Sequence, residues 1–166
     1  MIIGNGDIAS VIPDREDRLY FASGVSNSRE TRRSEYEREK KLLLKQDKYR
    51  HIVYFSSLCI FYSDILYAQH KRRMENLIKK HFKHYTIVRL GNITWGKNPN
   101  TIINFFKNKL KTGEPVKIWD AYRYVINEEE FLYWLKMIPA WSCEFNIPGE
   151  RLKVAEIVKR IKAGKL

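Results

Sequence analysis

Short apolar runs alternate along the chain with longer segments that have polar and apolar faces. The runs MIIG, RLYFASG, HIVYFSS and TIVRLGNI are bounded by glycine, turn residues or charges, as strands are. Between them, the segments from Asn27 or Ser28 to about Tyr49 and from Ile65 to Phe82 have helical periodicity. Strands that are apolar almost throughout and alternate with helices predict an α/β fold with a parallel sheet covered on both faces.

The first apolar run leads into a turn that contains two glycines. The stretch GNGDIASVI predicts a tight turn and then a brief helix. Gly4, Gly6 and Ala9 follow the G-x-G-x-x-A form of the dinucleotide fingerprint, in which glycines let the backbone turn and approach a pyrophosphate. An ordinary glycine turn is the structural alternative.

The last part of the chain is less regular. PVKIW, YRYVI and CEFNIP predict short strands, and residues 101–113, 127–138 and 154–164 predict helices. The helix at 101–113 ends at Gly113, and Glu128 to Glu130 form the acidic first turn of the next one after Asn127. No linker, repeat or low-complexity tract divides the 166 residues, so we expect a single compact domain over 1–166.

The charge balance favours an anionic partner. Thirty-one lysines and arginines against 19 acidic residues give a net charge of +12. That sign suits a nucleotide, a phosphate ester or a nucleic acid. Nucleic-acid binding is the weaker hypothesis, because the excess lies on helices with solvated outer faces and no aromatic platform of an RNA-binding module is recognisable.

Apolar and metal-ligating residues narrow the class further. No apolar stretch approaches the ~20 residues of a membrane span, and we expect a soluble protein with no membrane contact. The start of the chain lacks the pattern of a secretion signal and Cys59 and Cys143 sit in apolar surroundings, so we expect a cytoplasmic location. The four histidines lack a metal-ligand spacing, and we expect no metal.

Ser56 and Ser57 end a predicted strand, and Tyr67 and Lys71 lie four residues apart on the next helix. That spacing places the tyrosine and the lysine on one helical face. A free tyrosine has a pKa of ~10, and a neighbouring ammonium group lowers it toward the range useful for acid–base catalysis. A surface tyrosine and lysine without a shared role is the alternative interpretation.

Together these motifs resemble the extended short-chain dehydrogenase/reductase family that acts on nucleotide sugars. Five stretches occur in family order: GNGDIA, YFASG, VYFSS with YAQHK, VRLGNITWG, and RYVINEEE followed by FNIPGERLKVAEIV. The resemblance implies a Rossmann-like doubly wound parallel sheet, NAD or NADP as cofactor and a nucleotide-sugar substrate. It also implies a homodimer in which the two long helices form a four-helix bundle. Part of the seam would come from Leu42, Leu43, Leu66, Met74 and Leu77.

The resemblance also assigns roles to residues. Tyr67 would exchange a proton with a substrate hydroxyl or ketone, and Lys71 would hold the nicotinamide ribose and tune Tyr67. Ser57, four residues before Phe61, would hydrogen-bond the reacting oxygen, while Ser56 would face away. The remaining implied contacts are Gly4, Asn5, Gly6, Asp7, Ile8, Ser23, Gly24 and Lys71 for the cofactor, and Asn92 and Arg123 for the substrate. For Arg123, a plain surface position is the alternative.

The chain departs from the family pattern on the adenosine side. Only SVIPDREDR separates the fingerprint from LYFASG, where the family has two further strand–helix units. The acidic residue that holds the adenosine ribose, about 20 positions after the glycines, has no counterpart. We therefore expect a sheet reduced in strand number, with a small C-terminal substrate-side portion within about residues 97–150.

Two functions follow from these observations. The first is an NAD(P)-dependent oxidoreductase or epimerase acting on a nucleotide-linked sugar. The second is a non-redox sugar-nucleotide-binding or accessory protein of the same fold that has lost dinucleotide binding. Sugar dehydratases of the family carry an acidic pair after the catalytic serine or threonine, whereas Leu58 and Cys59 stand here. We therefore expect reduction or epimerisation rather than dehydration.

Overall fold

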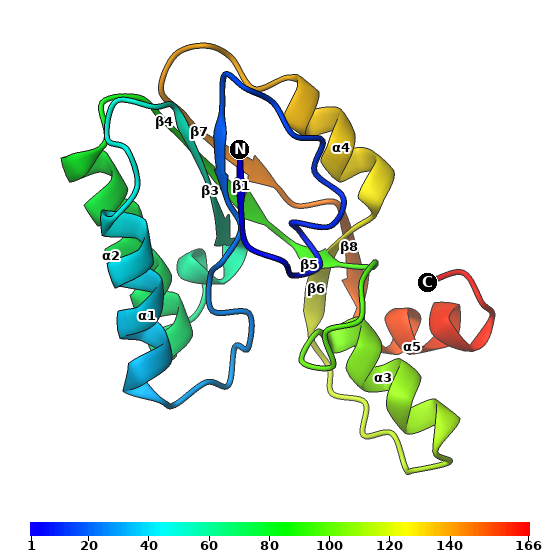
Figure 1. Ribbon diagram of the computed structural model, residues 1–166. Helices are drawn as coiled ribbons and strands as arrows, with labels where there is room; N and C mark the ends of the chain where they lie inside the picture. The colour runs from blue at the N-terminus through cyan, green and yellow to red at the C-terminus, as the bar shows by residue number, and fades with distance from the viewer.

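The computed structural model describes residues 1–166 as an alternation of strands and helices around a parallel sheet (Figure 1). Five strands lie in the order β1-β2-β3-β4-β7, and every neighbouring pair is parallel. The strands are β1 (Ile2–Ile3), β2 (Leu19–Phe21), β3 (Ile52–Ser57), β4 (Tyr85–Leu90) and β7 (Cys143–Ile147). The predicted Rossmann-like parallel sheet of reduced strand number is confirmed. Because no strand lies beyond β1, this two-residue strand forms one edge of the sheet.

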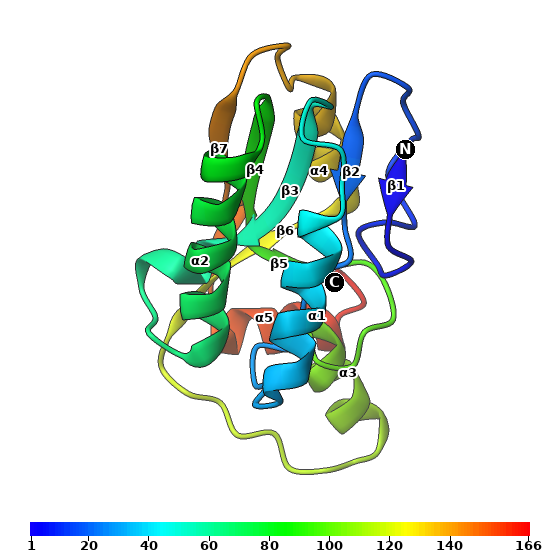
Figure 2. The same ribbon diagram turned by 60° about the vertical axis from the view of Figure 1, so that its left-hand side comes forward.

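Helices cover both faces of this sheet (Figure 2). Helices α1 (Arg33–Leu44) and α2 (Leu66–His81) lie on one face, and α4 (Glu128–Lys136) lies on the other. Successive residues of β3 alternate between the two cores, since side chains of a strand point to opposite faces. One core contains Phe21, Tyr54, Leu43, Met74 and Ile87, and the other contains Val53, Phe55, Val88, Phe131 and Leu135.

A second, smaller sheet lies beside the carboxyl end of the first. It has the order β5-β6-β8, formed by β5 (Asn92–Ile93), β6 (Tyr122–Ile126) and β8 (Glu150–Lys153). Helices α3 (Ile102–Lys111) and α5 (Val154–Lys162) pack against it at the lower right of Figure 1. None of the helices in the protein is both long and apolar enough to cross a membrane.

The segment after the fingerprint glycines differs from its prediction. The brief helix expected there is wrong: the backbone makes one turn, with Ser10 N–H bonded to Gly6 C=O at 3.0 Å. Pro13 follows at once and has no N–H to continue a helical ladder. The turn therefore carries no helix dipole toward the groove described below.

Three other predictions change in the structure. PVKIW forms no strand, and the run TIVRLGNI is two strands, β4 and β5, in different sheets. The break falls at Gly91, where a Cβ would lie 2.5 Å from the carbonyl oxygen of Pro148. Helix α1 begins at Arg33 rather than near Ser28, because the Glu30 carboxylate binds the N–H groups of the two residues before the helix and holds them in a loop.

Candidate active site

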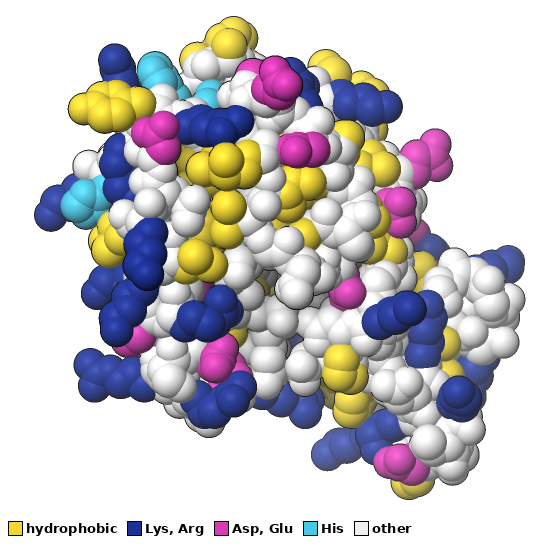
Figure 3. All heavy atoms as spheres, viewed as in Figure 1, with side chains coloured by type: hydrophobic (Ala, Val, Ile, Leu, Met, Phe, Trp, Pro, Cys, Tyr) yellow, Lys and Arg dark blue, Asp and Glu magenta, His cyan; other side chains and the backbone are white.

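A groove of about 1220 Å³ lies at the carboxyl ends of the strands of the large sheet. Its walls come from the loops after β1, β2 and β3, the start of α2 and the start of α3. The space-filling view shows this groove as a recess in the surface (Figure 3). Ligands of open α/β sheets bind at such a position. Except for Gly4, every predicted site residue lines it: Asn5, Gly6, Asp7, Ile8, Ser23, Gly24, Ser57, Tyr67, Lys71, Asn92 and Arg123.

Ser57 and Tyr67 approach the groove from two consecutive elements. Ser57 is the last residue of β3, and its hydroxyl accepts the N–H of Cys59 at 3.3 Å as the cap of a short 3₁₀ helix, η1 (Leu58–Phe61). Tyr67 lies in the first turn of α2. Burial raises the pKa of Tyr67 well above its ordinary value, and the nearby Cys59 and Glu39 raise it further, while the Ser57 hydroxyl lowers it in part.

Lys71 lies one helical turn after Tyr67 and is almost fully buried, with 2% of its surface exposed. Its ammonium group donates to Glu39 Oε1 at 3.1 Å and to the Tyr54 hydroxyl at 3.0 Å. It lies 5.6 Å from the ring centre of Tyr67. The lowering of the Tyr67 pKa that we expected from Lys71 is therefore wrong: burial raises this pKa, and the Glu39 carboxylate balances the ammonium charge.

Glu39, a buried partner of Lys71, is a residue near the groove that the sequence did not reveal. It lies on α1, is fully buried, and accepts four hydrogen bonds. Its donors are the Tyr54 hydroxyl at 2.7 Å, the Val25 N–H at 2.7 Å, His70 Nε2 at 2.9 Å and the Lys71 ammonium at 3.1 Å. Burial raises the pKa of Glu39, but Lys71 and His70 outweigh this effect and lower it to about 2. The carboxylate is therefore charged at neutral pH.

The predicted glycines have three different surroundings. Gly4 has a φ of +128°, and a Cβ there would lie 2.5 Å from the carbonyl oxygen of Ala22, so the close approach of β1 and β2 requires glycine. At Gly6 no atom lies within 4 Å of the Cβ position, and this space opens into the groove. At Gly24 a Cβ would lie 2.6 Å from Lys71 Nζ, so glycine leaves room for the buried ammonium group.

Asp7 binds the protein itself. Its carboxylate accepts the N–H groups of Lys97 and Asn98, each at 3.0 Å, and its carbonyl oxygen accepts the indole N–H of Trp95 at 3.0 Å. Gly96, with a φ of +87°, lies directly against the Asp7 side chain. Asp7 thus ties the fingerprint turn to the loop after β5, a role that only the long-range contacts reveal.

Two arginines that line the groove have no carboxylate partner. Arg123 contacts the Trp119 ring at 5.9 Å and donates to the carbonyl oxygen of Tyr122, and it has no carboxylate partner. Arg29 lies 5.7 Å from the Phe105 ring and also has no carboxylate partner. The side-chain amide of Asn92 donates to the carbonyl oxygen of Tyr124 at 2.8 Å. This contact links a residue that lines the groove to strand β6 of the small sheet. These guanidinium groups suit an anionic ligand.

The residues of the groove fit the nicotinamide end of a nicotinamide dinucleotide better than its adenosine end. The open space at Gly6, the loop at Ser23 and Gly24, and the Lys71 ammonium border the same groove. On the adenosine side, β1 is the edge strand and no acidic residue follows a second strand. No group of three or more histidine, cysteine, aspartate or glutamate side chains lies close enough together to hold a metal ion.

Comparisons with solved structures agree on the fold. No protein-family model matches the sequence, and no curated protein matches it. WbmG from Bordetella bronchiseptica, crystallised with NAD and UDP, matches 90% of this chain at a TM-score of 0.65 and 14% identity, over 56% of its own length. The dTDP-4-dehydrorhamnose reductase of Bacillus anthracis, crystallised with NADP, matches 89% at a TM-score of 0.67 and 13% identity, over 62% of its own length.

A UDP-galactose 4-epimerase matches 89% of this chain at a TM-score of 0.63 and 13% identity, over 61% of its own length. The chain thus spans less than two thirds of each of these three structures. The protein has the Rossmann-type fold that the nucleotide-sugar epimerases and reductases share, in a shortened form, as the sequence motifs predicted.

Proposed function

We propose that the protein is an NAD(P)-dependent oxidoreductase or epimerase that acts on a nucleotide-linked sugar through Ser57, Tyr67 and Lys71. One observation carries the proposal: side chains from the end of β3 and the start of α2 line the same groove as the fingerprint turn. The folds of NAD- and NADP-bound sugar-nucleotide enzymes support it. We expect such an enzyme in the cytoplasm.

Each of the three residues has a role in this proposal. The Ser57 hydroxyl binds the substrate oxygen, and the Tyr67 hydroxyl donates a proton to that oxygen or accepts one from it. The Lys71 ammonium, fixed by Glu39 and Tyr54, binds the nicotinamide ribose. A bound nicotinamide supplies or accepts the hydride.

The substrate class follows from charge. Arg123 and Arg29 each lie against an aromatic ring, and neither guanidinium group is paired with a carboxylate. Two such groups suit the phosphates of a sugar nucleotide. Asn92 borders the groove beside them. The UDP bound to WbmG is consistent with this class of ligand.

A second candidate function is favoured by the elements that are missing on the adenosine side of the sheet. No helix begins after Gly6, so backbone N–H groups there gain no helix dipole for a pyrophosphate. The two strand–helix units that would hold adenosine are absent from the chain. On this alternative, the protein binds a sugar nucleotide without redox chemistry, as a binding or accessory protein.

Tyr67→Phe tests the proposal because it removes only the titrating oxygen. We expect this substitution to lower kcat by roughly 10² to 10⁴-fold while thermal unfolding stays close to the wild type. The assay follows NAD(P)H consumption with nucleotide-linked keto-sugars. Tyr62→Phe is the matched control, since Tyr62 also borders the groove but is 59% exposed. Equal turnover in the wild type and Tyr67→Phe would refute the role of Tyr67.

A further inference from the structure

Two buried carboxylates, Glu39 on α1 and Glu75 on α2, have different partners. Glu75 pairs with Arg89 on β4, with Arg89 Nε to Glu75 Oε1 at 2.9 Å and a second contact at 2.6 Å. Glu39 pairs instead with Lys71, which lines the groove of the candidate active site. A buried ion pair can simply be part of the core, and the Glu75 pair is an example of this.

The Glu39 pair differs because its lysine is a predicted active-site residue. Lys71 Nζ has two acceptors within hydrogen-bond distance, Glu39 Oε1 and the Tyr54 hydroxyl. The Tyr54 hydroxyl itself donates to Glu39 Oε1 at 2.7 Å. Glu39 is held in turn by the Val25 N–H and by His70. The ammonium group is therefore fixed by a carboxylate that has no freedom to leave it.

Tyr67 faces this cluster from the same helix as Lys71. Other titratable groups near it are Cys59 on η1, Tyr36 and Glu39 on α1, and Tyr54 on β3. Since the charges of Glu39 and Lys71 cancel, no net positive charge remains to favour a phenolate. Burial and the Glu39 charge both raise the Tyr67 pKa, in agreement with this geometry.

We propose that Glu39 is a positioning residue that keeps the active site in its proton-donating form: it fixes the Lys71 ammonium and cancels its charge, so Tyr67 meets the substrate as a neutral phenol. This inference deepens the function proposed above and rests on it. At neutral pH the phenol can serve as a general acid without first gaining a proton. Removal of a proton from a substrate hydroxyl would first require ionisation of Tyr67, and would therefore speed up as pH rises.

The proton balance is that of a carbonyl reduction. The carbonyl carbon accepts a hydride from a reduced nicotinamide, which is oxidised, and the C=O electron pair moves to the oxygen. That oxygen forms an O–H bond with the Tyr67 proton as the phenolic O–H bond breaks. The phenolate then regains a proton from solvent.

Glu39→Gln tests this role without cofactor or substrate. Removal of the carboxylate leaves Lys71 and Tyr67 with an unbalanced positive charge, so together they should lose their first proton at a lower pH than in the wild type. NMR of ¹³C-labelled lysine Cε and tyrosine Cζ follows both groups. Tyr67→Phe and the double variant Glu39→Gln/Lys71→Met identify the signals.

Glu75→Gln is the matched control, because it breaks a buried ion pair on α2 whose partner is Arg89 rather than Lys71. We expect no change in the Lys71 and Tyr67 titrations in this variant. An unchanged titration in Glu39→Gln, or an equal shift in Glu75→Gln, would overturn the proposal. If Glu39→Gln does not fold, folding of the double variant Glu39→Gln/Lys71→Met supports the proposal. If neither variant folds, the proposal is contradicted, because Glu39 would then act independently of Lys71.

Turnover gives a second readout. In the wild type, kcat/KM for oxidation of the sugar alcohol should rise with pH, and in Glu39→Gln this rise should begin at a lower pH. Absence of any hydride transfer would refute the proposed function and leave the NMR result to decide the role of Glu39. The two failures are therefore distinguishable.

Discussion

His51 is a partly buried side chain whose contacts make the stability of the fold depend on pH. Arg18 Nη1 lies 3.0 Å from His51 Nδ1, and His51 Nε2 lies 2.8 Å from Thr86 Oγ1. A guanidinium group can only donate, so Nδ1 accepts and the ring is neutral with its proton on Nε2. Burial, then Arg18 and His84, lower the pKa of His51 from 6.5 to about 4.

This pKa predicts a pH dependence of stability. Between pH 6.5 and about 4, the unfolded chain holds a proton on His51 and the folded chain does not. The free energy of unfolding should therefore fall as pH falls through this range, by at most about 1.4 kcal/mol per pH unit from this residue. Urea unfolding at several pH values measures the slope. His51→Gln should flatten it, and an identical slope in the variant would contradict the assignment.

Glu39 marks the limit of what the sequence predicts at the residue scale. It lies in the run EREKK, which has the pattern of a solvated helical face. Its burial follows from Tyr54 on β3 and His70 and Lys71 on α2, which are 15 to 32 residues away along the chain. Local charge pattern contains no information on such partners. Ser57, Tyr67 and Lys71, by contrast, could be selected from the family motif.

At the scale of elements, the fingerprint turn contains two glycines with different roles: the fold requires Gly4, whereas Gly6 borders the groove. Gly4→Ala should lower the free energy of unfolding by about 1 to 3 kcal/mol, because its φ is positive and Ala22 blocks the Cβ position. Gly6→Ala should leave stability nearly unchanged, since its Cβ position is open. Thermal unfolding of both variants tests this pair. Equal destabilisation by the two substitutions would mean that the turn differs from the structure described.

Elements were predicted well where a local period decides them and poorly where distant contacts do. Helix α2 and strand β3 lie within about one residue of their predicted ranges, because apolar period and flanking polar residues define both. The strand expected at PVKIW is absent, and β8 was missed. Strand β8 pairs antiparallel with β6 after a turn at Gly149, whose φ is +68°. Its alternation is too short to predict without that partner.

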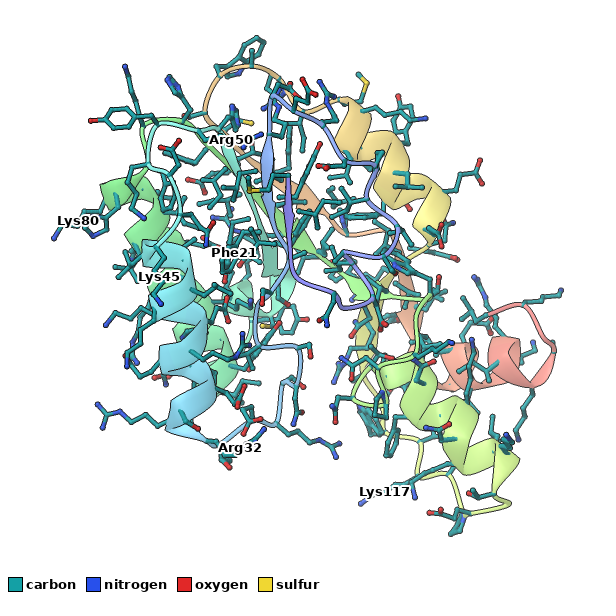
Figure 4. The ribbon with its side chains drawn as sticks, in the orientation of Figure 1. Phe21, Arg32, Lys45, Arg50, Lys80 and Lys117 are labelled. Carbon is teal, nitrogen blue, oxygen red and sulfur yellow. The ribbon has the colours of Figure 1, made fainter.

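At the scale of the whole molecule, the exposed face of α1 and α2 is the surface on which we expected two copies of the chain to form a dimer. Leu43 and Met74, which we expected in a dimer seam, are fully buried against the sheet, and Leu42 and Leu77 pack against the same core. Leu66 is 55% exposed. Arg32 and Lys45, at the two ends of α1, and Lys80 on α2 point outward (Figure 4). Phe21 lies inside, beside α1. Leu43 and Met74 are therefore wrong as seam residues.

A homodimer stays our proposal for the assembly, with Leu66 as the most exposed of the predicted seam residues. Sedimentation at micromolar concentration should then show a dimer, and Leu66→Asp should shift it toward monomer. Ile118→Asp is the control, because Ile118 is similarly exposed, at 49%, in the segment between α3 and β6. A wild-type protein that sediments as a monomer would remove this proposal.

The central claim is that a shortened Rossmann sheet still binds a nicotinamide cofactor in the groove of Ser57, Tyr67 and Lys71. A titration of the protein with NADH and NADPH, followed by fluorescence, tests it most directly. We predict saturable binding that is weak, because the adenosine side has lost its usual strands. Gly6→Val should weaken binding further with the fold intact, because its side chain would enter the open space beside the fingerprint turn. No binding of either cofactor at millimolar concentration to the folded protein would contradict the claim and favour a non-redox sugar-nucleotide protein.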